Sequence, residues 1–229
     1  MRLILLLLKY LFMLLCLVGG IGYGQSLWCL FAKVSENPGV WLFPAGGALS
    51  FFLAYLFYFS RRESFWSVME HELTHAVFAL LFFKKIHSFS AHRFRGGKIQ
   101  LEGGNFIIAL APYFFPTFTI FLFLLKPILN SRFHPYLNFA IGFTLMFHWV
   151  YLTREFHFGQ PDIRQSGRIF SIIVVIFGNI FFAGMVLAAT AGSFRDGGQF
   201  IRLGFRHSVQ FLQYLLSIWP LTAPGLSAN

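Results

Sequence analysis

The sequence predicts an all-α polytopic membrane protein with about six transmembrane helices, and two observations support this fold class. Hydrophobic residues make up 57% of the 229 residues and charged residues only 11%, whereas a water-soluble domain carries about 25% charged residues. Each of six apolar runs is close to the ~20 residues that cross a ~30 Å hydrocarbon core. The runs cover residues 3–23, 40–59, 65–83, 105–127, 134–153 and 169–191.

The first and fourth runs carry residues that bear on how they cross the membrane. The first run follows Arg2, as in a signal peptide, but it is long for such a peptide and contains Lys9. We therefore expect a retained transmembrane helix.

In the fourth run, Pro112 and Pro116 predict a kink, because proline has no backbone N–H to donate within a helix.

The chain is predicted to form one membrane-embedded domain over residues 1–229, because no repeat, low-complexity tract or long linker interrupts it. Near the C-terminus, Arg202 and Arg206 lie on one side of a Phe- and Leu-bearing segment. This pattern is typical of an amphipathic helix at a membrane surface, or of a short last span. The domain then comprises two accessory spans (1–60), a core with the polar motifs (65–190) and the amphipathic segment (197–219).

The formal net charge of +10 is best explained by membrane topology. Lys and Arg concentrate in the cytoplasmic loops of membrane proteins, and no basic stripe interleaved with aromatic residues indicates nucleic-acid binding. The basic residues divide almost evenly between alternate loops, and the cluster at 84–104 favours an N-terminus outside. We expect a multi-pass protein of a bacterial inner membrane, in contact with the lipid bilayer. Cys16 and Cys29 form neither a disulfide framework nor a cysteine-based zinc site.

The third apolar run contains the motif His71-Glu72-Leu73-Thr74-His75. On a helix, His71 and His75 project from one face, one turn apart, so that two imidazoles can reach one metal ion. Glu72 lies about 100° round the helix, where it can approach a water molecule as a general base. Ionisable residues inside a membrane helix are costly and usually mark function. The motif therefore predicts a catalytic zinc site.

Such a site needs a third protein ligand and an open position for water. The metzincin continuation is absent, because Phe78 and Leu81 replace its glycine and third histidine. Asp162 precedes the sixth run. Two spans separate it from the motif, so the chain can return and bring Asp162 close to the two histidines. The other acids downstream are Glu102, Glu155 and Asp196, whereas His87 and His92 are expected in solvent and His148 is expected to be buried and hydrogen-bonded.

The segment 84–104 is unlike the other connections. Between two Gly pairs, polar and apolar residues alternate with period two over Lys98, Ile99, Gln100, Leu101 and Glu102. Alternation bounded by turn residues is a strand signature. The sequence thus predicts a small β-hairpin-like segment after the helix that carries the histidines.

These features together resemble the site-2 protease family of intramembrane zinc metalloproteases, of which this chain would be a divergent member. The resemblance rests on the motif inside a transmembrane helix, the Gly-rich hairpin-like segment after it, and the later Gln160-Pro161-Asp162. The family typically has Asn-Pro-Asp-Gly or Leu-Asp-Gly at that point, so Gln160 replaces the Asn and Ile163 the Gly. The resemblance covers roughly residues 65–190.

The resemblance implies an intramembrane endopeptidase with one zinc ion (Zn²⁺) ligated by His71, His75 and Asp162. Glu72 would deprotonate the attacking water and pass the proton to the leaving amine. The substrate would be a membrane-anchored protein. Because a transmembrane helix satisfies its own amides, it must unwind before cleavage, and an edge strand can pair with the unwound segment. The stretch Lys98 to Glu102 could be that strand, or a plain structural loop.

Two other interpretations stay open on the residues alone. One is a membrane-bound gluzincin-type zinc peptidase, with Glu102 or Glu155 as the third ligand. The other is a non-catalytic protein, either a pseudoprotease or a transporter that uses Glu70, Glu72 and Asp162 as a proton relay.

Overall fold

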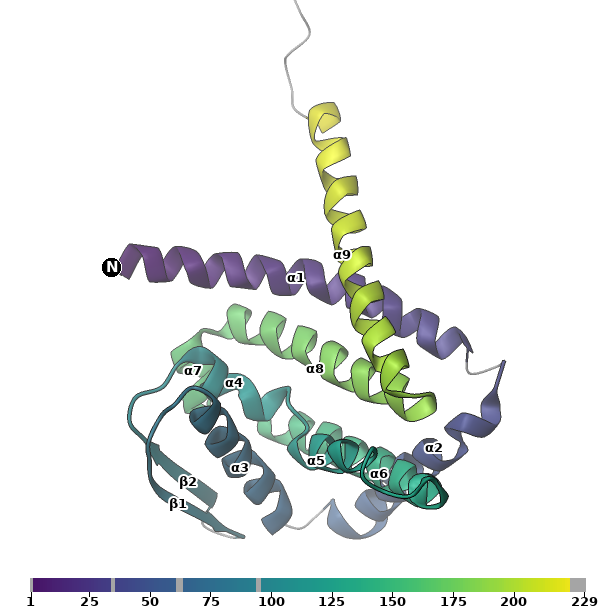
Figure 1. Ribbon diagram of the computed structural model, residues 1–229. Coiled ribbons are helices and arrows are strands. Elements are labelled where there is room, and N and C mark those ends of the chain that lie inside the picture. The colour runs from purple at the N-terminus through teal and green to yellow at the C-terminus, as the bar shows by residue number, and fades with distance from the viewer. Residues whose placement is uncertain (1, 34–35, 61–63, 94–95, 223–229) are drawn as a thin grey trace, which may run out of the picture.

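The computed structural model describes residues 2–33, 36–60, 64–93 and 96–222, and these are mostly helical (Figure 1). The α-helices are α1 (Arg2–Ala32), α2 (Pro38–Ala54), α3 (Phe65–Leu81), α4 (Phe106–Leu110), α5 (Thr117–Leu125), α6 (His134–Glu155), α7 (Pro161–Ser166), α8 (Arg168–Ala191) and α9 (Phe194–Thr222). The π-helical turn η2 (Tyr55–Phe59) continues α2, and 3₁₀ turns η3 (Ala111–Tyr113) and η4 (Ser131–Phe133) follow α4 and precede α6. The two strands are β1 (Ile86–His92) and β2 (Gly96–Leu101).

Fewer helices than predicted are long and apolar enough to cross a membrane. Among the described residues, three qualify: Leu6–Ala32, Pro38–Phe59 and Arg168–Ala191. A fourth is counted if Phe106–Tyr113 and Thr117–Leu125 form one span bent by 79°. The prediction of six spans is therefore not confirmed. The third run forms a helix of only 17 residues with ionisable side chains, and the fifth is diluted by polar residues such as His148 and Arg154.

The element boundaries bear on the first and the fourth of these runs. The first run continues as helix to Ala32, nine residues beyond its predicted end, because the glycines between 19 and 24 do not interrupt α1. The kink predicted at Pro112 and Pro116 is confirmed, since the helix breaks between η3 and α5.

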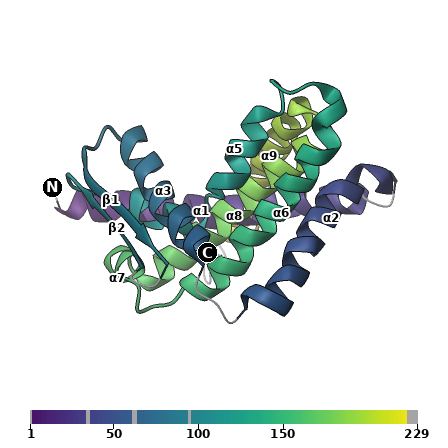
Figure 2. The ribbon, with the colours of Figure 1, turned by 90° about the horizontal axis from the view of Figure 1, so that it is seen from below.

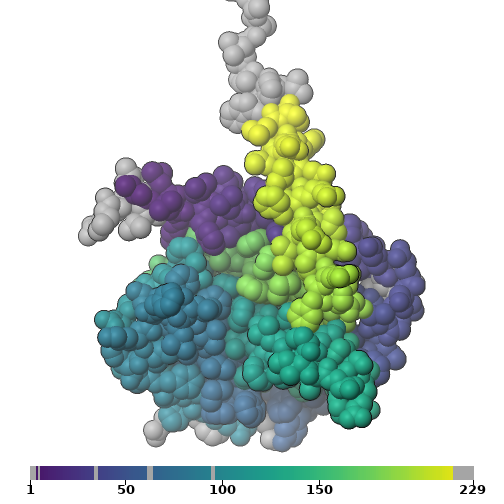
Figure 3. All heavy atoms as spheres, viewed as in Figure 1, coloured from purple at the N-terminus to yellow at the C-terminus, as the bar shows by residue number. Residues whose placement is uncertain are grey.

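The helices α1, α8 and α9 pack on one another. The helix α1 packs alongside α8, and α9 packs on both and crosses α1. Figure 2 shows the hairpin with α3 at one end of the molecule and α2, packed on α6, at the other. In the space-filling view the end of α9 projects away from the rest of the protein (Figure 3). The site described below lies at the end with the hairpin.

The hairpin is an antiparallel pair, as the alternating pattern predicts. Its register pairs Ile86 with Leu101 and His92 with Gly96, with an irregularity between Ile86 and Ser88. Burial alternates residue by residue along β2. Glu102, which the pattern included, lies just beyond the strand. The hairpin packs against α3 and thereby covers part of the histidine motif.

One hydrophobic cluster fixes α7 relative to the rest of the core. It joins Leu110 and Tyr113, from the broken segment, to Phe170 and Val174 of α8. Ile163 is fully buried in the same cluster. Because Ile163 follows Asp162 directly, this packing also sets the position of the Asp162 carboxylate.

The helices α2 and α6 approach each other through two glycines. A Cβ atom on Gly47 would lie 1.9 Å from the carbonyl oxygen of Phe139, and one on Gly142 would lie 1.9 Å from that of Pro44. Small residues at such positions let two helix backbones come into contact, as they do in membrane helix pairs.

This contact predicts the effect of adding one methyl group. Gly47→Ala and Gly142→Ala should each lower the free energy of unfolding by about 1–3 kcal/mol, because backbone atoms must move apart. Gly46→Ala is the matched control, since its Cβ would lie 3.8 Å from the Phe139 ring, an ordinary contact. Denaturation of the purified protein in detergent measures the difference. Equal stability of all three variants would show that the helices are not in close contact.

Candidate metal centre

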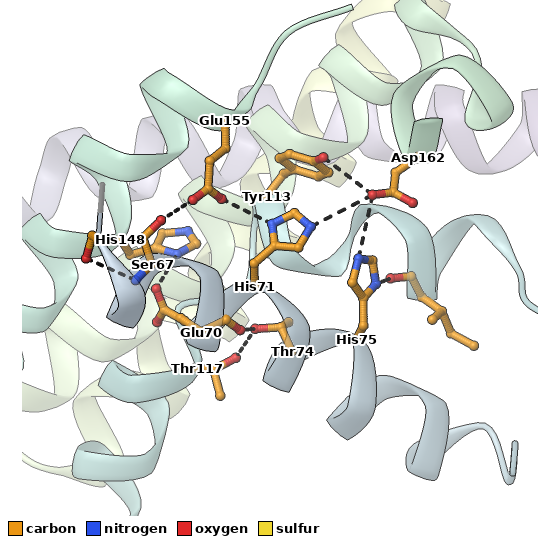
Figure 4. Close-up of polar contacts among 12 residues, drawn as sticks. Ser67, Glu70, His71, Thr74, His75, Tyr113, Thr117, His148, Glu155 and Asp162 are labelled. Atoms are coloured by element: carbon orange, nitrogen blue, oxygen red, sulfur yellow. Dashed lines mark hydrogen bonds and ion pairs between the residues drawn. The ribbon is translucent and has the colours of Figure 1, made fainter. Parts of the chain in front are cut away.

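The helix α3 places both histidines of the motif on one side. It begins after Ser64, whose side chain accepts a hydrogen bond from the N–H of Ser67. The rings of His71 and His75 lie 4.9 Å apart, centroid to centroid. Both point from α3 towards the start of α7, where Asp162 lies (Figure 4). This is the arrangement expected of histidines four residues apart on a helix.

Asp162 completes a group of three side chains that can hold a metal ion. Its Oδ2 lies 3.6 Å from Nε2 of His75 and 3.9 Å from Nε2 of His71. One ligand atom from each residue lies within 4.8 Å of the other two. Two imidazoles and one carboxylate form a donor set that suits zinc, with a position left open. Zinc bonds are about 2.0–2.2 Å long, so a bound ion would draw these atoms closer together.

The orientation of His75 is fixed by a backbone carbonyl. Nδ1 of His75 lies 2.9 Å from the carbonyl oxygen of Ile108. A carbonyl oxygen accepts but cannot donate, so Nδ1 of the neutral ring must carry the hydrogen. Nε2 then keeps its lone pair and faces Asp162. This is the tautomer that a metal ligand requires.

The Ile108 carbonyl is free for this contact because of Pro112. In a continuous α-helix it would accept a hydrogen bond from the N–H of residue 112. Residue 112 is a proline and has no N–H. The proline that interrupts the helix thus leaves a carbonyl available for the histidine.

His71 is oriented in the same way by a carboxylate. Its Nδ1 lies 3.1 Å from Oε2 of Glu155, the last residue of α6. The other oxygen of Glu155 accepts a short hydrogen bond from the hydroxyl of Ser67. Both imidazoles therefore present Nε2 to the space beside Asp162, and both have an acceptor at Nδ1.

Asp162 is held as an anion by its surroundings. Burial alone would raise the pKa of its carboxyl, but the imidazoles of His71 and His75 beside it outweigh burial and hold that pKa well below its ordinary value. The hydroxyl of Tyr113 lies 3.5 Å from the same carboxylate oxygen. The ring of Tyr113 also packs against His71, with the ring centroids 5.3 Å apart.

Glu72 lies under the hairpin. Its side chain is buried, and strand β2 passes directly over it. A Cβ atom on Gly97 would lie 2.5 Å from Oε1 of Glu72 and 2.2 Å from its Cγ. Only glycine at this point lets the strand pass so close to the carboxylate.

The remaining acids and histidines singled out in the sequence lie elsewhere. Glu102 is exposed, and Glu155 contacts His71 on the Nδ1 side, away from Asp162 (Figure 4). His148 is buried, with Nδ1 3.6 Å from Glu70 and Nε2 without a hydrogen-bond partner among the described residues. Glu70 accepts a hydrogen bond from the N–H of Phe118 at the start of α5. On the hairpin, His87 and His92 are exposed.

A cavity of about 470 Å³ adjoins the candidate metal centre. His75 and Asp162 lie in its wall, and so do Ile99 and Leu101 of strand β2. The lining also includes the polar residues Lys9, Asn105, Gln165 and Ser166. Lys98 and Gln100, which alternate with the two lining residues, are exposed. The cavity thus offers both apolar and polar surface next to His75 and Asp162.

Reasoning from the sequence missed Ile108, Tyr113 and the contact of Glu155 with His71. Each reaches the motif from a different element, so spacing along the chain does not reveal the contact. The one local signal was the pair of prolines that flank Tyr113 and break the fourth run.

No family model matches the chain, and no curated protein or solved structure matches it either. Proposals about its function therefore depend on the geometry of the site.

The grouping predicts the metal content of the purified protein. We expect about one zinc ion per chain, and we expect its loss in His71→Ala, His75→Ala and Asp162→Ala. Glu102→Ala should keep the metal, because Glu102 is exposed. Elemental analysis of the protein purified in detergent measures this. Retention in Asp162→Ala together with loss in Glu102→Ala would identify a different third ligand.

Proposed function

We propose that this protein is an intramembrane zinc endopeptidase that hydrolyses peptide bonds in membrane-anchored proteins. The observation that carries the proposal is the convergence of His71, His75 and Asp162, with Nε2 of both imidazoles turned towards one carboxylate. A polar packing cluster does not require this shared orientation, whereas a metal site does.

The residues have distinct parts in the proposed reaction. His71, His75 and Asp162 would hold the zinc ion, which supplies Lewis-acid activation of a water molecule and of the scissile carbonyl. Glu72 would accept a proton from the attacking water and donate it to the leaving amine. The polar lining at Lys9, Asn105 and Gln165 offers water a route through the adjoining cavity.

Strand β2 supports a mode of substrate binding. In the part of the chain that the structure describes, β2 pairs with β1 alone, so its other edge has backbone groups available. An unwound substrate segment can pair with such an edge through main-chain hydrogen bonds. Ile99 and Leu101 would contact the substrate within the cavity, and Lys98, Gln100 and Glu102 would flank it.

In this proposal the protein is a multi-pass protein of a bacterial inner membrane, and the reaction takes place within its membrane-embedded part. Several helices suit a membrane in length and apolarity. We include α3 and α6 among the membrane-embedded helices, although they are not among the helices that are long and apolar enough to span a membrane by themselves. Four of their ionisable residues are buried in the protein interior: Glu70, Glu72, His75 and His148. A helix shielded by its neighbours can carry such residues.

A gluzincin-type site receives less support from the geometry. Its third ligand would be Glu102 or Glu155. Glu102 is exposed, and Glu155 contacts the wrong nitrogen of His71 for a shared metal ligand.

Replacement of the proposed general base tests the function itself. Glu72→Gln should retain zinc, because Glu72 is not a ligand, and should lower cleavage by about 10²–10⁴-fold. Comparative proteomics of membrane fragments from cells with wild type and Glu72→Gln measures this, since uncleaved substrates accumulate in the variant. An unchanged fragment pattern would contradict the proposed proteolysis.

Gly97 gives a second test that leaves every proposed chemical group in place. Gly97→Ala should retain zinc but lower cleavage by up to about 100-fold, because the added methyl group displaces the Glu72 carboxylate. Gly46→Ala serves as the control for a glycine far from the site. Cleavage of a substrate found by the proteomic comparison is the measurement. Wild-type cleavage by Gly97→Ala would show that β2 does not lie over Glu72.

A further inference from the structure

The Glu155 carboxylate lies behind His71, opposite the side on which Asp162 lies (Figure 4). One oxygen is 3.1 Å from Nδ1 of His71, and the other accepts a hydrogen bond from the hydroxyl of Ser67. Ser67 and His71 are four residues apart on α3, so one carboxylate from the end of α6 bridges two adjacent turns of the motif helix.

This arrangement matches what the Ile108 carbonyl does for His75. In both cases an acceptor at Nδ1 leaves the lone pair of Nε2 directed at Asp162. The acceptor for His75 belongs to the backbone, whereas the acceptor for His71 is a side chain and can be replaced. Ser67 limits the rotation of the Glu155 carboxylate and thereby fixes the direction from which His71 is held.

We propose that Glu155 is a positioning residue for the metal centre, which orients His71 and selects the tautomer that binds the ion. The inference rests on the proposed zinc site. Carboxylates hydrogen-bonded to a metal-bound histidine raise the basicity of the ligand and hold its ring, and their loss typically lowers metal affinity by 10–100-fold.

A purely structural contact between α6 and α3 is the alternative. The Glu155 side chain is 26% exposed, and ion pairs in contact with solvent contribute little to stability. The alternative therefore predicts a small change in unfolding and no specific change in metal affinity. The two roles differ in what they do to zinc binding by a folded protein.

The test is a zinc affinity measured by chelator competition on the full chain in detergent, after removal of metal. Glu155→Ala should weaken zinc binding by about 100-fold. Glu155→Gln keeps an acceptor for Nδ1 of His71 without the charge, so it should weaken binding by only about 10-fold. The thermal midpoint of the zinc-free protein should change little in either variant.

Glu70→Gln is the matched control. It also replaces a carboxylate of the polar core next to α3, but Glu70 lies on α3 itself. Its carboxylate accepts a hydrogen bond from the N–H of Phe118 and lies near His148 rather than His71. Its zinc affinity should stay within about threefold of wild type, well below the effect expected for Glu155. Wild-type affinity in Glu155→Ala, with zinc lost in His71→Ala, would overturn the positioning role and leave the metal site intact. Absence of zinc binding by the wild type would overturn the metal site and the positioning role together.

Discussion

Polar groups of α3 that are buried in an apolar protein must each find a partner, and the rest of the core is arranged to supply them. His75 binds the Ile108 carbonyl, and Glu70 binds the Phe118 N–H. Both partners belong to the segment that breaks between α4 and α5, where backbone groups are released from helical pairing. An unpaired polar group in such surroundings would cost several kcal/mol. The break in one helix thus satisfies the side chains of another.

The same requirement explains why the two histidines of α3 meet the ends of other helices. The last residue of α6 meets His71, and the first turn of α7 brings Asp162. Helix ends carry free backbone groups and polar side chains, so they suit a site that must be polar.

Much of this architecture could be predicted from the sequence, and the parts that could not share a physical cause. Apolar runs and the period-two pattern predicted helices and the hairpin, because these depend on residues close in the chain. Six spans were predicted, and three or four helices among the described residues are long and apolar enough to cross a membrane. The helix α3 falls short of that length, which an apolar run in the sequence does not reveal, and it carries ionisable side chains. Asp162 could be named as a candidate from Pro161 and its position in the chain, whereas the contact of Glu155 with His71 depends on tertiary packing.

Pro112 shows how a residue can shape the candidate metal centre without lying in it. Its side chain is not a ligand, and its contribution is the hydrogen that its nitrogen lacks. Any other residue at this position would bring a backbone N–H that can also donate to the Ile108 carbonyl. Pro112 therefore contributes to the tautomer of His75, which lies more than thirty positions away in the chain. A search for charged or metal-binding side chains would not find this proline.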